Sequence, residues 1–200
     1  MKRLFLFAAA MAAAVSAQAA GIGVRAGTTG VGADVAWDLA PTLSARVGYS
    51  ALKWNQDVDT DNVSYDGKLK LSNLNTMVDF HPLGPVFRIT GGVIFNKNKY
   101  DVRSTDLGGL VTGTVEPGRS AAPYLGIGWG TVAGTGINFY ADLGIMFMGS
   151  PQATLRANCA PSPACTALQS QAAAEERRLE DELKNFKHYP VLNIGLTVGF

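Results

Sequence analysis

The chain has 200 residues, which is long enough for one domain with a sizeable core. Its 17 basic and 16 acidic side chains nearly balance, so it lacks the basic surplus of a nucleic-acid-binding surface, and we expect no nucleic-acid partner. No run of 18 apolar residues follows the N-terminal segment, which excludes a helical membrane protein.

The first 19 residues have the parts of an export signal. Two basic residues precede an apolar run over residues 4–15, and residues 17–19 (Ala-Gln-Ala) give the small-x-small pattern of a signal-peptidase site. The apolar run is shorter than the ~20 residues that span a bilayer. We expect residues 1–19 to be a cleaved signal peptide, with an uncleaved anchor as the alternative, and residues 20–200 to form the exported domain.

After the signal, the chain divides into stretches in which apolar residues alternate with small or polar ones, separated by turn signals. Such alternation indicates strands with one apolar face, because successive side chains of a strand point to opposite sides. The final stretch, PVLNIGLTVGF, shows the pattern most clearly. The expected strands cover residues 22–28, 31–38, 43–50, 68–80, 87–96, 123–131, 137–147 and 190–200.

The fourth stretch changes phase once. Leu69 and Leu71 occupy odd positions, whereas Leu74, Val78 and Phe80 occupy even ones. Such a slip indicates either a β-bulge or a strand end that has risen clear of the apolar layer.

The connections alternate in length. Tight turns follow the second, fourth and sixth strands, and longer loops follow the third, fifth and seventh, namely an acidic loop (55–66), a polar loop (101–120) and an insertion at about 150–189. Only the connection after the first strand is short where a long one is expected. This asymmetry, with an even strand count, is typical of outer-membrane barrels. We predict an all-β fold, a monomeric eight-stranded antiparallel up-and-down transmembrane β-barrel of the outer membrane.

Aromatic residues of the apolar face gather beside the tight turns and the C-terminus. Rings at this height form the interfacial girdle of a transmembrane barrel. The expected girdle contains Trp37, Phe80, Phe87, Trp129 and Phe139, with Phe200 at the chain end.

These features resemble the small eight-stranded outer-membrane barrels of Gram-negative bacteria, of the OmpA, OmpX and OmpW type. The resemblance lies in the signal peptide, the strand–turn rhythm of residues 21–200, and the final phenylalanine; residues 123–128 also look like the sixth strand of OmpW-like members. It implies that the barrel-assembly machinery reads the alternating end of the chain. The positions concerned are Leu192, Ile194, Leu196, Val198 and Phe200.

Eight strands enclose an interior barely wide enough for side chains. The inward positions carry charges of both signs, and a buried charge without a partner costs several kcal/mol. We expect arginine–carboxylate pairs within the set Arg25, Asp34, Asp38, Arg46, Asp79, Arg88 and Asp142. The pattern favours a plugged, stiffened interior over a conducting path, and the glycines at 126, 128 and 130 leave room for Tyr140 or an arginine from across the interior.

The sequence has few candidates for catalytic or metal-binding residues. His81 and His188 are expected at opposite rims, and no serine, histidine and aspartate converge, so we predict no enzymatic activity. The alternating aspartates of the acidic loop imitate a calcium loop, but its glycine and final glutamate are missing. We therefore expect no metal and no cofactor.

The insertion at 150–189 is the most distinctive segment. Cys159 and Cys165 lie six residues apart in a proline-rich stretch, and in an exported chain this spacing predicts one disulfide. Residues 167–187 predict a helix, with capping-box spacing at Thr166 and Gln169. Its thin apolar stripe could pack on the barrel rim or contact a partner protein. The stripe contains Leu168, Ala172, Leu179, Leu183 and Phe186.

The expected role is therefore structural or interactive at the cell surface, in contact with outer-membrane lipid and lipopolysaccharide. Two alternatives stay open. One is a narrow channel for small, perhaps hydrophobic, solutes, which the resemblance to OmpW-like proteins implies. The other is a lipid-modifying barrel enzyme.

Overall fold

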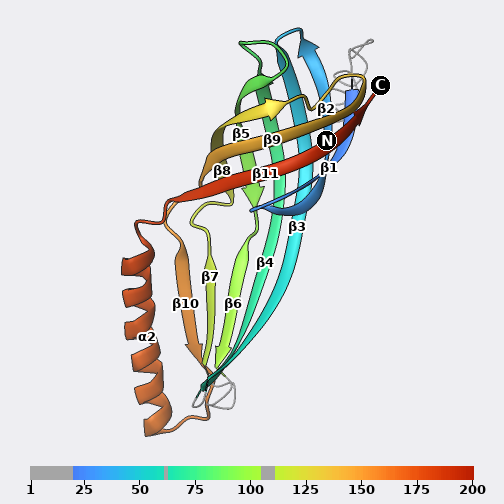
Figure 1. Ribbon diagram of the computed structural model, residues 1–200. Helices are drawn as coiled ribbons and strands as arrows, with labels where there is room; N and C mark the ends of the chain where they lie inside the picture. The colour runs from blue at the N-terminus through green and yellow to red at the C-terminus, as the bar shows by residue number, and fades with distance from the viewer. Residues whose placement is uncertain (1–19, 61–62, 105–110) are drawn as a thin grey trace, which may run out of the picture.

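The computed structural model describes residues 20–60, 63–104 and 111–200, so the predicted signal peptide lies outside the described residues. Within them the chain forms one antiparallel sheet of 11 strands and one helix, α2 (Pro163–Leu183) (Figure 1). The predicted all-β antiparallel fold is confirmed. The strands are β1 (Ala20–Gly27), β2 (Gly30–Ala40), β3 (Leu43–Thr60), β4 (Val63–Phe80), β5 (Phe87–Asn96), β6 (Lys99–Ser104), β7 (Val111–Glu116), β8 (Ala121–Gly130), β9 (Gly136–Phe147), β10 (Gln152–Ala157) and β11 (His188–Gly199).

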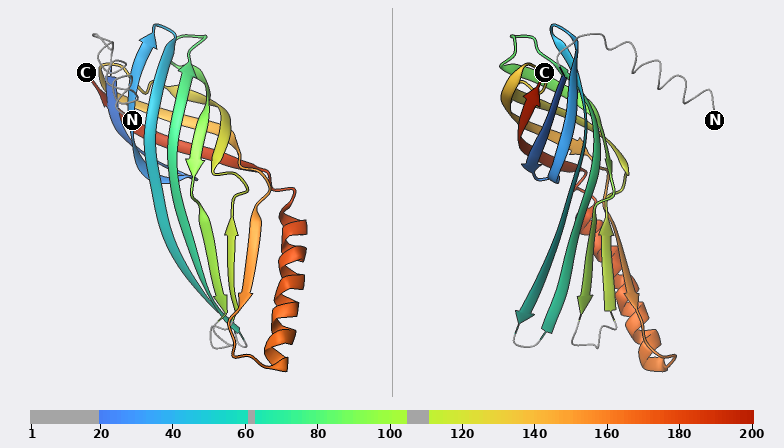
Figure 2. Two further views of the ribbon diagram at one scale, coloured as in Figure 1. Left: turned by 180° about the vertical axis from the view of Figure 1, so that it is seen from behind. Right: turned by 90° about the vertical axis from the view of Figure 1, so that its right-hand side faces the viewer.

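The strand order is β10-β7-β6-β4-β3-β2-β1-β11-β9-β8-β5, and β4 also pairs with β5. Each of the eight strands β1–β5, β8, β9 and β11 therefore has a hydrogen-bonded neighbour on both sides. We call these eight strands the curled sheet, because Figures 1 and 2 show the sheet turning back on itself until β5 lies beside β4. The last strand pairs with the first, with Gly21 opposite Gly199.

Beyond the curled sheet, β3 and β4 continue as a long hairpin that β6, β7 and β10 extend sideways (Figure 2). We call residues 52–60 and 63–71, with β6, β7 and β10, the extension. The predicted acidic and polar loops are therefore wrong, because most of their described residues pair as strands, Thr60 opposite Val63 included. These strands escaped the sequence pattern because their outward positions are polar rather than apolar.

The phase change in β4 has a different cause from a bulge. The register between β3 and β4 shows no shift along its whole length, so the bulge alternative is wrong. Leu71 lies on the same buried face as Asn73 and Asn75, whereas Leu74 and Phe80 are exposed. The strand keeps its geometry, and what changes along it is which face carries the apolar side chains.

Helix α2 begins earlier than the capping-box spacing predicted. Its N-cap is Ser162, whose side chain accepts a hydrogen bond from the backbone N–H of Cys165, and Pro163 opens the first turn, where its missing N–H costs nothing. The predicted disulfide between Cys159 and Cys165 is confirmed at this end of the helix. No helix among the described residues is both long enough and apolar enough to cross a bilayer.

The helix runs alongside β10, the terminal strand of the sheet order (Figure 1). Glu176 accepts a hydrogen bond from the backbone N–H of Leu155 at 2.8 Å. Ala172 of the predicted stripe is buried, whereas Phe186 is exposed. The helix thereby covers a strand edge that would otherwise present unpaired backbone groups.

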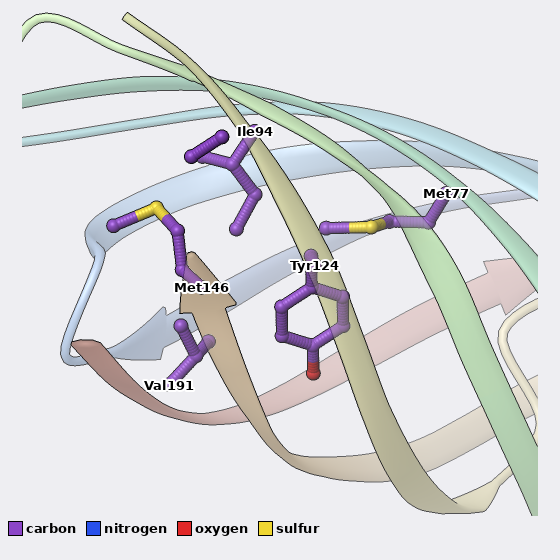
Figure 3. Packing of buried hydrophobic residues seen from close by; sticks show 6 residues of the cluster. Met77, Ile94, Tyr124, Met146 and Val191 are labelled. Carbon is purple, nitrogen blue, oxygen red and sulfur yellow. The ribbon is translucent and has the colours of Figure 1, made fainter. Parts of the chain in front are cut away.

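Two apolar clusters lie inside the curled sheet. In Figure 3 the labelled side chains of the first cluster converge on one another from β4, β5, β8, β9 and β11. This upper cluster contains Met77, Ile94, Ala122, Tyr124, Met146 and Val191. The second, the turn cluster, contains Ala36, Val132, Ala133 and Tyr140.

Candidate functional site

The curled sheet has its polarity reversed relative to a water-soluble protein. Its outward positions carry large apolar side chains, such as Leu125, Phe139 and Ile194 at 57%, 71% and 62% exposure. Its enclosed positions carry charged and amide side chains that are almost completely buried. Charged residues are rarely buried unless they are paired, so the enclosed face is the candidate site.

Two arginines and two aspartates form the centre of a charge network on this face. Arg46 reaches Asp142 at 2.8 Å and Asp79 at 3.5 Å. Arg88, on β5, reaches Asp142 at 2.6 Å and Asp79 at 3.5 Å. All four side chains are at most 3% exposed. Each charge therefore has two partners of opposite sign in a place without water to screen it.

Tyr140 connects this centre to a second ion pair. Arg25 and Asp34 lie 2.9 Å apart, and the Tyr140 hydroxyl donates a hydrogen bond to Asp34. The guanidinium groups of Arg46 and Arg88 lie 5.1 and 5.2 Å from the centroid of the Tyr140 ring, within cation–π range. Six of the seven expected charges thus meet around one tyrosine.

Asp38 is the exception. It is only half-buried and lines a separate cavity of about 100 Å³ with His81 at the tight-turn end of the sheet. The register of β2 against β3 shifts between Asp38 and Ala40, so the strand loses its regular inward alternation at this point. The expectation that Asp38 joins the network is therefore wrong.

Glycines make room for the large polar side chains. A Cβ at Gly128 would lie 2.5 Å from Nε of Arg88, which comes from the neighbouring strand β5. Tyr140 instead packs over Gly195 of β11. The expected space on the sixth predicted strand therefore takes an arginine from the adjacent strand, and the tyrosine uses a glycine that the sequence pattern did not single out.

The network is closed off at both ends. On the extension side the upper cluster covers it, and on the other side Val132 and Ala133 of the β8–β9 turn are buried, at 1% and 5% exposure. The short β1–β2 turn also folds inward. Thr29 is 1% exposed, and its carbonyl accepts hydrogen bonds from Ser50 and Asn73. The connection that is unexpectedly short therefore helps to fill the interior.

Sequence reasoning missed two neutral hydrogen-bond donors of the enclosed face. Thr90 donates a hydrogen bond to Asp79 at 2.5 Å, and Thr29 donates one to the Asn193 side chain at 3.0 Å. Thr90 shares the inward parity of Arg88, so the same alternation could have found it. Nothing in the sequence pattern indicates that Thr29, which belongs to a turn, would be buried.

The expected girdle and assembly residues lie on the outward face. Phe80, Trp129 and Phe139 are exposed near the tight turns, whereas Trp37 and Phe87 are half-buried. The rings of Phe87 and Trp129 meet edge to face with centroids 6.4 Å apart. In β11 Leu196 is half-buried, and four residues of the final pattern are exposed: Leu192, Ile194, Val198 and Phe200.

The histidines lie apart from each other and from the network. His81 lies in the turn after β4, and His188 packs on Phe147 at the start of β11 with ring centroids 5.3 Å apart. No group of three or more side chains that could hold a metal ion occurs in the part of the chain that the structure describes. Asp57 and Asp59 of the supposed acidic loop belong to β3, and Asp61 lies outside the described residues.

No known protein family model and no curated protein matches the sequence. Solved structures do match. CarO of Acinetobacter baumannii is 20% identical with a TM-score of 0.63, covering 90% of this chain and 97% of CarO. CarO2 of the same organism is 18% identical, also with a TM-score of 0.63, covering 92% and 100%. A major outer membrane protein of Thermus thermophilus is 17% identical with a TM-score of 0.45, covering 92% and 100%.

The CarO proteins are outer-membrane β-barrel proteins. At this level of identity the likeness concerns the fold. The antiparallel sheet of this chain therefore has a fold similar to that of the CarO proteins.

Proposed function

We propose that this protein is a monomeric, eight-stranded transmembrane β-barrel of the bacterial outer membrane, of the small OmpA/OmpX/OmpW-like kind, with a structural or surface-interaction role. The pairing of each of the eight strands with two neighbours supports the barrel, because closure is what removes free edges from a membrane-spanning sheet. The apolar outward face supports lipid as its surroundings.

The reversal of polarity along β3 and β4 supports a membrane boundary. Tyr49 and Leu74 are the last large apolar outward residues, and Lys53 and Lys70 follow them on the same face. The reversal occurs at about the same height on both strands, since Tyr49 pairs with Leu74 and Lys53 with Lys70. A change of solvent from lipid to water explains it, and the extension then stands in water at the cell surface.

We base the choice of role on one observation, the closed interior of the curled sheet. Six buried charges pair with charges of opposite sign between two apolar clusters, so an ion that entered would have to break several short ion pairs and displace packed side chains. An interior of this kind stiffens the barrel and does not conduct. The extension and α2 then supply the surface for contact with other molecules. The two histidines lie at opposite ends of the curled sheet, so they do not form one site.

Planar-bilayer recording tests this proposal. The purified protein, shown to be folded by faster gel migration before boiling than after it, is added to one chamber, with a porin as the positive control. We expect no current steps above the lipid baseline. Regular steps that change size in the Arg46→Ala or Asp142→Ala variant would instead establish the narrow channel.

A further inference from the structure

The outward face of the curled sheet is hollowed over β1, β9 and β11. Two adjoining hollows, of about 670 and about 400 Å³, share Ala26 and Ile194. The larger one lies over one hydrogen-bonded row of the sheet, in which Trp129 pairs with Ala141, Ala141 with Ile194, and Ile194 with Ala26. We call the two hollows together the wall groove.

The groove exists because small residues lie among large ones. Ala26 and Ala141 form its floor, whereas Val24 and Phe139 project beside it at 60% and 71% exposure. Trp129 closes the end beside the tight turns. The larger hollow alone has the volume typical of small-molecule sites, about 300–1,000 Å³, and its outward side chains are apolar.

We propose that the wall groove binds an acyl chain of lipopolysaccharide. This inference rests on the proposed function, because the groove faces the acyl-chain layer only if the sheet is a membrane barrel. In that layer an apolar groove cannot be filled by water, and a chain that lies in it gains more contact than a chain on the convex wall beside it. The ligand is therefore a long saturated hydrocarbon chain.

The open end of the groove indicates which lipid supplies the chain. The smaller hollow reaches Thr28 and Leu192 at the end of β1 nearer the extension, which is the outer-leaflet side of the proposed barrel. Thr28 is hydrogen-bonded there to Pro190, and the exposed Lys187 stands three residues before that proline. A cation at this height complements a lipid phosphate. These positions favour lipopolysaccharide over a phospholipid of the inner leaflet.

Native mass spectrometry of the protein extracted from outer membranes in a mild detergent tests the site. We expect one lipopolysaccharide to stay on the wild-type chain. Ala141→Phe and Ala26→Phe fill the floor, and displacing about two methylenes at ~0.8 kcal/mol each lowers the affinity for the lipid about tenfold, so the lipid-bound fraction falls. Ala45→Phe, on the outward face of β3 away from the groove, is the matched control and should retain the lipid.

Gel migration before and after boiling separates a failure of the barrel from a failure of the groove. If the wild type shows no heat-modifiable migration, the barrel itself is contradicted. If the barrel is intact but lipopolysaccharide is absent, is bound equally by all variants, or is replaced by phospholipid or by a second copy of the chain, the groove assignment is overturned. Ala141→Leu, which adds less volume, repeats the test should Ala141→Phe fail to assemble.

Discussion

At the scale of single residues, the enclosed face can hold buried charges because they occur in equal numbers of opposite sign. Three arginines (25, 46 and 88) face three aspartates (34, 79 and 142), and the closest contacts are 2.6 to 2.9 Å. A buried ion pair adds little stability over well-packed apolar residues, but removal of one partner leaves an uncompensated charge. The network therefore makes the interior intolerant of single substitutions.

A substitution of Asp142 tests this intolerance, because Asp142 forms ion pairs with both Arg46 and Arg88. We expect Asp142→Ala to lower the free energy of unfolding by about 3–5 kcal/mol, the cost typical of breaking a buried pair. Urea unfolding in lipid vesicles, followed by tryptophan fluorescence, measures it. Asp181→Ala, which breaks an exposed contact with Lys184, is the control and should change nothing measurable. Equal losses in the two variants would contradict the network.

Gly195 tests the packing of Tyr140. A Cβ at this position would overlap the Tyr140 ring, whereas at Gly91, on β5, it would meet nothing within 4 Å. We expect Gly195→Ala to cost about 1–3 kcal/mol, as overpacking does, and to weaken the hydrogen bond from Tyr140 to Asp34. Gly91→Ala should be nearly neutral in the same urea titration. A neutral result at both positions would show that Tyr140 can move aside at no cost.

Individual residues show which parts of the enclosed face the sequence predicts. The period-two alternation places Arg46 and Asp142 on one enclosed face even though they lie 96 positions apart. It fails for Asp38, where the register shifts, and for Thr29, which belongs to a turn. Alternation is a property of regular strands, so it carries no information where the strand pairing becomes irregular.

At the scale of elements, the sequence predicts the strands of the curled sheet and misses the extension. β7, β10 and most of β6 lie within segments expected to be loops. They are short, and their outward positions hold residues such as Lys99, Thr114 and Arg156, so they lack the apolar outward face by which the other strands were recognised. Neighbouring strands stabilise them, and this information is not local in the sequence.

Asp101 of β6 links its own strand to β4 and β7 in the extension. Its carboxylate accepts hydrogen bonds from Lys70 on β4 at 2.9 Å and from Thr114 on β7 at 3.0 Å. Partial burial favours the neutral acid, but these hydrogen bonds and the charges of Lys70 and Lys99 outweigh it and lower the pKa of Asp101 below 3.8. The ionised form therefore stabilises the folded extension above that pH.

Because the folded-state pKa is the lower one, this contribution is present above pH 3.8 and is lost as the pH falls through the folded-state pKa. We expect hydrogen exchange of the β6 amides, corrected for intrinsic rates, to lose protection below about pH 3.8 while the β9 amides stay protected. The Asp101→Asn variant should have reduced protection already at pH 7 and no further step in this range. An unchanged acid step in that variant would assign the transition to another group.

At the scale of the whole molecule, one continuous sheet carries two opposite arrangements of polarity. In the curled sheet the apolar side faces outward and the polar side inward, and in the extension Leu71 is buried while Lys70 is exposed. The two arrangements are stable in different surroundings, lipid for the first and water for the second. In the proposed barrel, the position of the reversal therefore sets how deeply the protein would sit in the membrane.

Outward substitutions by arginine measure this depth directly. Leu143, near the middle of β9, is 48% exposed on the apolar face, whereas the exposed Gln152 of β10 lies on the polar side of the extension. At the bilayer midplane an outward arginine costs about 2–4 kcal/mol, and the cost falls toward zero near the interface. We expect Leu143→Arg to lower the free energy of unfolding in urea-titrated vesicles by that amount and Gln152→Arg to leave it unchanged. Equal tolerance of both would mean that Leu143 faces water, and the proposed membrane boundary between Leu74 and Lys70 would then be wrong.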